Sequence, residues 1–154
     1  SRNGQSYNEK FSLIAEELHA LPQNVILDGE LVILEENGLP NFQKLQNYER
    51  GKTEGVLRYY VFDIVYLNGY DMQLLPLIDR KSFLPELLEG LAHCVYCDHI
   101  EGMGTMFYNK AIESGLEGVI AKKKDSNYYP GLRFEHWLKI KNIESDEFLV
   151  IPAH

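Results

Sequence analysis

The chain has 154 residues, of which 45% are hydrophobic and 25% are charged, and its formal net charge is −8. These values are typical of one globular domain with a buried core, and they exclude attraction of anionic partners by overall positive charge. No apolar run approaches the ~20 residues that cross a bilayer, and no signal peptide opens the sequence, so we expect no membrane association. The first residues are polar and lack an initiator methionine, which indicates a piece of a longer protein.

Two elements are predicted in the first quarter of the chain. Apolar residues recur at helical spacing between Tyr7 and Leu21, which predicts an amphipathic helix that Pro22 ends. Residues 24–36 predict a strand closed by a turn at Asn37-Gly38. Strand alternation gives it two faces, one with Ile26, Asp28, Glu30 and Val32, the other with Leu27, Gly29, Leu31 and Ile33.

Two carboxylates in this otherwise apolar strand need an explanation. Burying Asp28 or Glu30 costs free energy unless the carboxylate finds a partner. Gly29 lies between them and removes a side chain where a backbone or a ligand could come close. We therefore expect Glu30 to face a ligand, with a simple ion pair to a lysine as the alternative.

A second strand is predicted over residues 57–67 and ends at the turn Asn68-Gly69. Alternation places Tyr60, Phe62, Ile64 and Tyr66 on one face, and Tyr59, Val61, Asp63 and Val65 on the other. Aromatic residues at a period of two indicate core packing, and a platform for a ligand is the alternative.

The remaining pattern mixes short helices with strands. Helices are predicted over 42–48, over 79–91 with Asp79 as the N-cap, and over 103–114 with Gly115 ending the last one, and a short strand over 95–99. No phosphate loop and no dinucleotide fingerprint is present. We therefore predict an α+β fold with mainly antiparallel sheets flanked by helices.

Cys94 and Cys97 lie between His93 and His99. Four such ligands could suggest zinc, but a structural zinc site wraps its ligands around a tetrahedron, and one short extended segment cannot do so. We expect free thiols, as in a reducing cytoplasm.

The stretch from Glu117 to Lys141 is basic in an acidic chain, with six Lys or Arg against three Asp or Glu. Alternation puts Lys139 and Lys141 on one face of a strand and predicts a buried row, Leu138 and Ile140, on the other. Two ammonium groups this close repel each other unless an anion lies between them. We therefore expect an anion site here, with a solvated basic hairpin as the alternative.

Several of these segments together carry a family resemblance. LDGEL (27–31), YVFDIVYLNG (60–69), EGVIAK (117–122) and WLKIK (137–141) occur in this order. They resemble the nucleotidyltransferase motifs of ATP-dependent DNA ligases, and the opening SRNG is similar to the segment that follows the nucleophile motif. The pattern Tyr129-x-Gly131-x-Arg133-x-x-x-Trp137 is most similar to bacterial non-homologous end-joining ligases.

The resemblance implies ATP and Mg²⁺ as cofactors and nicked duplex DNA as substrate. In such ligases a lysine takes AMP from ATP, the AMP passes to a 5′-phosphate at a nick, and the 3′-hydroxyl displaces it. Phe62 would stack on adenine and Glu30 would accept from the ribose hydroxyls. Glu117 would bind Mg²⁺, a hard cation that prefers carboxylate oxygen. Lys139 and Lys141 would hold the AMP phosphate and stabilise charge developing at phosphorus.

Contacts with nucleic acid are implied for Arg2, Lys122 and Arg133. By strand alternation Lys122 lies on the face away from Glu117, so a structural role is its alternative. Other end-joining domains or proteins would be partners, and the location would be cytoplasmic. Residues 1–143 would be a fragment of the adenylation domain, truncated at its N-terminus, and 144–154 a linker toward an absent OB-fold domain.

The sequence departs from the family pattern at one decisive point. No Lys-x-Asp-Gly, the nucleophile motif, occurs in it. We therefore expect this chain alone to be inactive in self-adenylation. Two alternatives stay open, namely an RNA ligase or capping guanylyltransferase relative, and a non-catalytic module that binds nucleotide or DNA.

Overall fold

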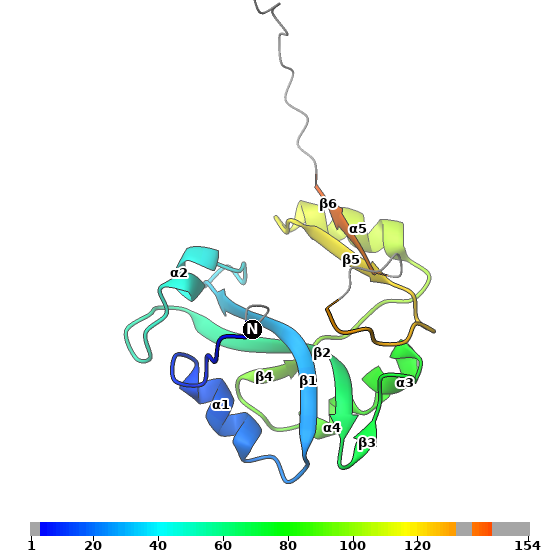
Figure 1. Ribbon diagram of the computed structural model, residues 1–154. Helices are drawn as coiled ribbons and strands as arrows, with labels where there is room; N and C mark the ends of the chain where they lie inside the picture. Colours follow the sequence, from blue (N-terminus) through cyan, green and yellow to red (C-terminus); the bar gives the residue numbers. More distant parts are fainter. Residues whose placement is uncertain (1–3, 132–136, 143–154) are drawn as a thin grey trace, which may run out of the picture.

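The computed structural model describes residues 4–131 and 137–142, so Arg2, Arg133 and residues 143–154 lie outside the described residues. Helices alternate irregularly with strands (Figure 1). The elements, in chain order, are α1 (Ser12–His19), β1 (Val25–Leu34), α2 (Phe42–Gln46), β2 (Val56–Leu67), β3 (Tyr70–Asp71), α3 (Leu77–Ser82), α4 (Leu84–Leu87), β4 (Cys94–Tyr96), α5 (Gly104–Glu113), β5 (Gly118–Lys122) and β6 (Trp137–Lys141).

The larger sheet is built around β2. This strand pairs antiparallel with β1 and β3 and parallel with β4. The smaller sheet consists of β5 and β6, which are antiparallel. The expected α+β fold with mainly antiparallel sheets is thus confirmed, with β4 as its parallel strand.

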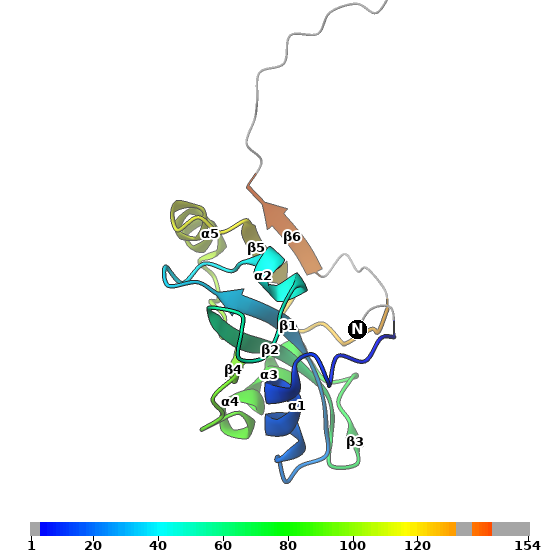
Figure 2. The ribbon, with the colours of Figure 1, turned by 90° about the vertical axis from the view of Figure 1, so that its left-hand side faces the viewer.

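The hydrophobic core lies on one face of the larger sheet. Ile14 of α1, Leu84 of α4 and the nearby Leu88 pack there against strand residues such as Ile33 and Val61, and all five are buried. Figures 1 and 2 place α1 and α4 on this side and the β5–β6 sheet beyond the other side. The face of the larger sheet that points away from the core is therefore turned toward the smaller sheet.

Strand β2 does not alternate as its sequence predicts. The pairing with β1 shifts register twice, and Phe62 and Val65 are the residues without a partner in β1. Val61 and Ile64 are both fully buried in the core although they lie three residues apart. The prediction that Ile64 shares a face with Phe62 is wrong, because a β-bulge adds one residue and reverses the alternation beyond it. Strand β1 carries no extra residue, and Leu27, Leu31 and Ile33, which alternation places on one face, all pack on the core.

The predicted helix over 79–91 is two short helices, α3 and α4. The N-cap of α3 is Pro76, and Asp79 lies in the first turn of the helix. The helix is interrupted at Phe83, which lies between α3 and α4. Pro85 explains the break, since proline has no N–H to donate to the carbonyl four residues earlier. Helix α1 is likewise shorter than predicted. Helix α5 ends just before Gly115, whose positive φ of 80° is typical of the glycine that follows a helix.

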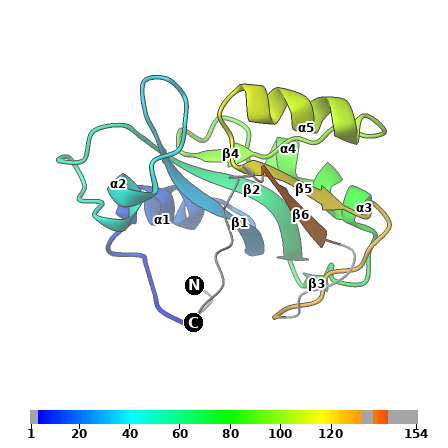
Figure 3. The same cartoon turned by 90° about the horizontal axis from the view of Figure 1, so that it is seen from above.

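Helix α5 and the smaller sheet form the end of the molecule opposite α1 (Figures 1 and 3). The Tyr108 hydroxyl of α5 donates to the Lys141 carbonyl oxygen at 3.4 Å. Gly118 opens β5 where the two strands approach closely, and a Cβ at this position would overlap the carbonyl oxygen of Ile140. Glycine is thus required at the pairing of β5 with β6.

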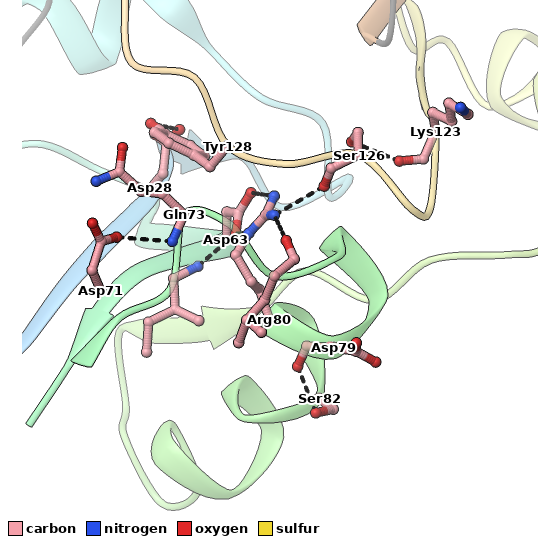
Figure 4. Close-up of polar contacts among 12 residues, drawn as sticks. Asp28, Asp63, Asp71, Gln73, Asp79, Arg80, Ser82, Lys123, Ser126 and Tyr128 are labelled. Atoms are coloured by element: carbon pink, nitrogen blue, oxygen red, sulfur yellow. Dashed lines mark hydrogen bonds and ion pairs between the residues drawn. The ribbon is translucent and has the colours of Figure 1, made fainter.

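A buried ion pair joins the two parts of the fold (Figure 4). Arg80 of α3 donates to both carboxylate oxygens of Asp63 on β2, at 2.7 and 2.9 Å, and neither side chain is exposed. Its remaining nitrogen donates to the carbonyl oxygens of Leu75 and Ser126. Ser126 follows β5, so the guanidinium ties the segment after β5 to the larger sheet.

Replacing Asp63 with alanine should destabilise the protein by about 3–5 kcal/mol, because it leaves the Arg80 charge buried without its counter-ion. Urea unfolding measured by circular dichroism checks this value. Glu16→Ala is the control, since it breaks the exposed ion pair with Arg50 (2.6 Å) and should cost no more than about 1 kcal/mol. Equal losses in the two variants would contradict a structural role for the buried pair.

Candidate nucleotide site

The candidate site lies between the two sheets, on the face of the larger sheet that points away from the core. Glu30 of β1 pairs with Tyr60 of β2, so it belongs to this face, and its side chain is exposed. Phe62, two residues beyond Tyr60, occupies the first bulge. Among residues 4–131 and 137–142, no lysine or arginine forms an ion pair with Glu30, so the simple ion-pair alternative for Glu30 finds no support there.

Phe62 contacts the smaller sheet through an aromatic and cationic cluster. The rings of Phe62 and Trp137 meet edge to face, with centroids 6.2 Å apart and planes at 83°. The Lys122 ammonium lies over both rings, 3.8 Å from the Phe62 centroid and 3.7 Å from that of Trp137. Tyr128 adds a second edge contact with Trp137 at 6.2 Å. We call Phe62, Trp137 and Lys122 the cage.

The Lys122 ammonium is held by the rings rather than by hydrogen bonds. Its Nζ atom is buried and has no hydrogen-bond partner. Burial away from water lowers the pKa of Lys122 to about 8, with Lys81 lowering it further and Asp63, Asp28 and Cys97 opposing the shift. The Lys122 side chain is thus mostly protonated at neutral pH, and it loses its proton within a short interval above neutral pH.

Glu117 joins the two lysines of β6. One of its carboxylate oxygens lies 3.2 Å from Lys139 Nζ and 3.3 Å from Lys141 Nζ. Hydrogen bonds from Lys139 and then Lys141 lower the pKa of the Glu117 carboxyl. The group between the two ammonium groups is a carboxylate of the chain itself, and an anion site for a ligand stays a prediction.

Two expectations about this sheet are wrong. Leu138 and Ile140 are not a buried row, since their exposed fractions are 56% and 43%. Lys122 lies opposite Trp137 in the register of β5 and β6, so it shares the face of Lys139 and Lys141 and is not on the far side. Strand alternation does not relate Lys122 to Glu117, because β5 begins at Gly118 and Glu117 lies before it.

The smaller sheet therefore presents one face to the larger sheet. Trp137, Lys139 and Lys141 alternate along β6 and point to the same side. Since Trp137 touches Phe62, this side is the one that faces the larger sheet. The structure thus brings Phe62, Lys122 and the two lysines of β6 with Glu117 to facing surfaces. Glu30 lies on the same surface as Phe62.

The two surfaces are in contact at Phe62 and Trp137. Two hollows of about 430 and 360 Å³ lie elsewhere, one lined by Lys44 and Asn47 near α2, the other by Leu18 and Val25 between α1 and β1. Neither includes a residue of the cage. The side chain of Lys122 takes the space over the Phe62 ring.

No metal cluster accompanies the site. Among the described residues no group of three or more His, Cys, Asp or Glu could hold a metal ion. Cys94 and Cys97 are free thiols, as predicted, and burial raises the pKa of Cys94 to about 12. No helix in the described part of the chain has the length and apolar character needed to cross a membrane.

Sequence reasoning missed three residues that shape the site. Trp137 was part of a motif but had no assigned role, and Tyr128 and Arg80 were not selected. Tyr128 donates to the Asp28 carboxylate at 2.9 Å and lies against the Arg80 guanidinium, 5.8 Å from it. The signal available was two carboxylates, Asp28 and Asp63, in neighbouring apolar strands, since each needed a buried donor.

Comparison with known proteins identifies the family. Residues 1–141 match the family model described as ATP dependent DNA ligase domain, and the chain belongs to this family. The match resolves the choice among nucleotidyltransferase relatives in favour of DNA ligases.

The relatives include bacterial end-joining and ligase-like proteins. The chain is 36% identical over 159 residues to the multifunctional non-homologous end joining protein LigD of Pseudomonas aeruginosa, covering 98% of this chain and 18% of that protein. It is 30% identical over 131 residues to the SPbeta prophage-derived DNA ligase-like protein LigB of Bacillus subtilis, covering 84% and 48%. The chain thus spans less than half the length of these two relatives.

Solved structures show the same fold. The crystal structure of the ligase domain from M. tuberculosis LigD superposes with a TM-score of 0.77 at 32% identity, covering 92% of this chain and 46% of that one. A mycobacterial DNA ligase D complexed with ATP and MES superposes at 0.75 with 33% identity and the same coverages. The predicted nucleotidyltransferase fold is consistent with both.

The emission of Trp137 should report the charge on Lys122. Trp137 is the only tryptophan in the chain, and its fluorescence should change with a midpoint near pH 8 as the ammonium loses its proton and its cation–π attraction. A fluorescence pH titration measures this. Lys122→Met should give a flat profile over the same interval. A midpoint near 10.5, the ordinary value for lysine, would contradict the cage.

Proposed function

We propose that the chain is part of the catalytic domain of an ATP-dependent DNA ligase that seals 5′-phosphate/3′-hydroxyl nicks through a lysyl-AMP and a DNA-adenylate. The family match supports the reaction class. The observation that supports this role most is the placement of Lys139 and Lys141, bridged by Glu117, on the surface that faces Phe62. Two cations on a surface that faces an aromatic ring suit a nucleoside monophosphate, which needs counter-charges for its phosphate and a platform for its base.

Each proposed role follows from the chemistry of the side chain. Phe62 stacks on the adenine, and the exposed carboxylate of Glu30 accepts from the ribose hydroxyls. Lys139 and Lys141 hold the AMP phosphate and stabilise the charge that develops at phosphorus. Their ammonium groups already lie within 3.3 Å of one carboxylate oxygen, so they are positioned to share an anion.

Glu117 is the proposed contact for Mg²⁺. This ion commonly binds through one or two carboxylates together with substrate phosphates, while keeping several water molecules. A single exposed carboxylate fits that arrangement, and Mg²⁺ would supply charge neutralisation on the phosphates when bound. In this structure the carboxylate is paired with both lysines, so nucleotide phosphate and Mg²⁺ would together take over these pairs.

The substrate and partners are proposed from the relatives. Nicked duplex DNA is the substrate, with Arg2, Lys122 and Arg133 as candidate contacts. Other end-joining domains or proteins are the candidate partners, and the cytoplasm is the proposed location. The non-homologous end joining named for LigD of Pseudomonas aeruginosa makes DNA repair the process.

Loss of the Phe62 ring should weaken binding of AMP by about 1–3 kcal/mol, the range measured for stacking of a base on an aromatic side chain. Isothermal titration calorimetry on wild type and Phe62→Ala measures this change. Phe42→Ala is the matched control, because Phe42 is 75% exposed and lies on α2. AMP binding that is absent in wild type, or equal in wild type and Phe62→Ala, would contradict the proposed nucleotide site.

The chain by itself should form no covalent adduct with AMP, because its sequence contains no Lys-x-Asp-Gly motif. Incubation with ATP labelled at the α-phosphate and Mg²⁺, followed by a denaturing gel, tests this. A radioactive band would contradict the prediction and would show that another lysine of the chain accepts AMP. Lys139→Ala and Lys141→Ala would then identify whether that lysine lies in β6.

A further inference from the structure

The Lys122 ammonium occupies the space over Phe62 in which a stacked base would lie. A base stacked on Phe62 would place its atoms about 3.5–4.0 Å above the ring, the usual separation of carbon atoms in contact. The Lys122 ammonium lies at this height, 3.8 Å from the ring centroid. A base and this ammonium therefore cannot occupy the same face of Phe62 together.

We propose that Lys122 is an internal plug of the base site, which holds the face of Phe62 in the nucleotide-free protein and must leave it when the base binds. The inference rests on the proposed function, because it takes the Phe62 face as the place of the base. It gives Lys122 a role in nucleotide exchange that is separate from its candidate contact with DNA.

The plug is held by contacts that are easily exchanged. A lysine ammonium has three N–H donors, and here none of them has a hydrogen-bond partner. The aromatic rings attract the charge, but the ammonium has given up its hydration to reach them. When it leaves, it regains hydrogen bonds to water, and these offset much of the lost attraction. A stacked base can therefore displace it at modest cost.

The side chain can leave without disturbing the sheets. Lys122 is the last residue of β5 and pairs with Trp137 through the backbone, so its side-chain torsions alone can move the ammonium away from Phe62. The segment after it is anchored separately, since Arg80 donates to the Ser126 carbonyl oxygen at 2.9 Å. The exchange is thus a local side-chain movement against two fixed rings.

Charged and titratable groups around the cage change how strongly the Lys122 ammonium is held there. Asp63 and Asp28 attract the ammonium, and Lys81 repels it. Asp63 accepts from Arg80 and Asp28 accepts from Tyr128, and neither carboxylate accepts a hydrogen bond from Lys122. Cys97 also lies near the cage and influences Lys122.

Removing the plug should strengthen nucleotide binding. We expect Lys122→Ala to bind AMP about fivefold more tightly than wild type, the factor that a cation–π contact of ordinary strength represents. Lys122→Arg keeps a cation for the cage and should stay within about twofold of wild type. Lys123→Ala is the matched control, because the neighbouring side chain is 58% exposed and pairs with Asp125 at 3.5 Å.

Calorimetric titration with AMP on these variants decides the proposal. Lys122→Gln, which keeps most of the length of the side chain and removes the charge, replaces Lys122→Ala if thermal melting shows that the alanine variant is unfolded. Tighter binding in the uncharged variant supports the plug. Equal or weaker binding overturns it and makes Lys122 an ordinary contact residue or a bystander.

Nuclear magnetic resonance of lysine labelled at Cε gives an independent readout. The ε-methylene protons of Lys122 should show large upfield shifts from the two rings, identified by their loss in Lys122→Arg. Saturating AMP should move these resonances toward ordinary lysine values, and unchanged shifts on AMP binding would overturn the exchange. If the upfield resonances are present but AMP does not bind to wild type, the cage stands while the proposed nucleotide site and the exchange at it both fail.

Discussion

The relation between the two sheets depends on the buried ion pair between Asp63 and Arg80. The hydrophobic core lies on the opposite face of the larger sheet, so apolar packing there does not position β5 and β6. Arg80 instead bonds one residue of β2 and the carbonyl oxygen of Ser126, and Tyr128 lies against its guanidinium. A buried charge that is fully bonded is costly to break, because either partner alone would be an uncompensated ion. This polar connection and the contact of Phe62 with Trp137 both join the smaller sheet and the segment after β5 to the larger sheet.

The existence and order of the elements were readable from the sequence because they depend on local patterns. Both long strands, the turn at Asn68-Gly69 and the glycine that ends α5 appear close to their predicted places. The errors arise where backbone geometry departs from the ideal repeat. The bulge at Phe62 reverses the alternation of β2, and Pro85 interrupts what reads as one helix.

The candidate site was only partly predictable for a different reason. Repulsion between Lys139 and Lys141 can be inferred from the sequence, but the sequence does not show that Glu117 lies beside both ammonium groups. The pairing of Glu117 with Lys139 depends on a contact between segments that are distant in the sequence. The position of Lys122 over Phe62 does so too, since these two residues are more than fifty positions apart. Local alternation carries no information about which faces of two sheets meet, so no role in the site was predicted for Trp137 or Tyr128.

The bulge at Phe62 also constrains how this strand can vary in length. One additional residue there lets Val61 and Ile64 both enter the core while Asp63 points out of it to meet Arg80. Deleting a single residue at the bulge would exchange interior and exterior for the residues that follow, because the side-chain repeat of a strand is two. Ile64 would then face the smaller sheet and the carboxylate of Asp63 would enter the apolar interior. Insertions and deletions at this point are therefore far more disruptive than substitutions, although the residue concerned lies in the middle of a long strand.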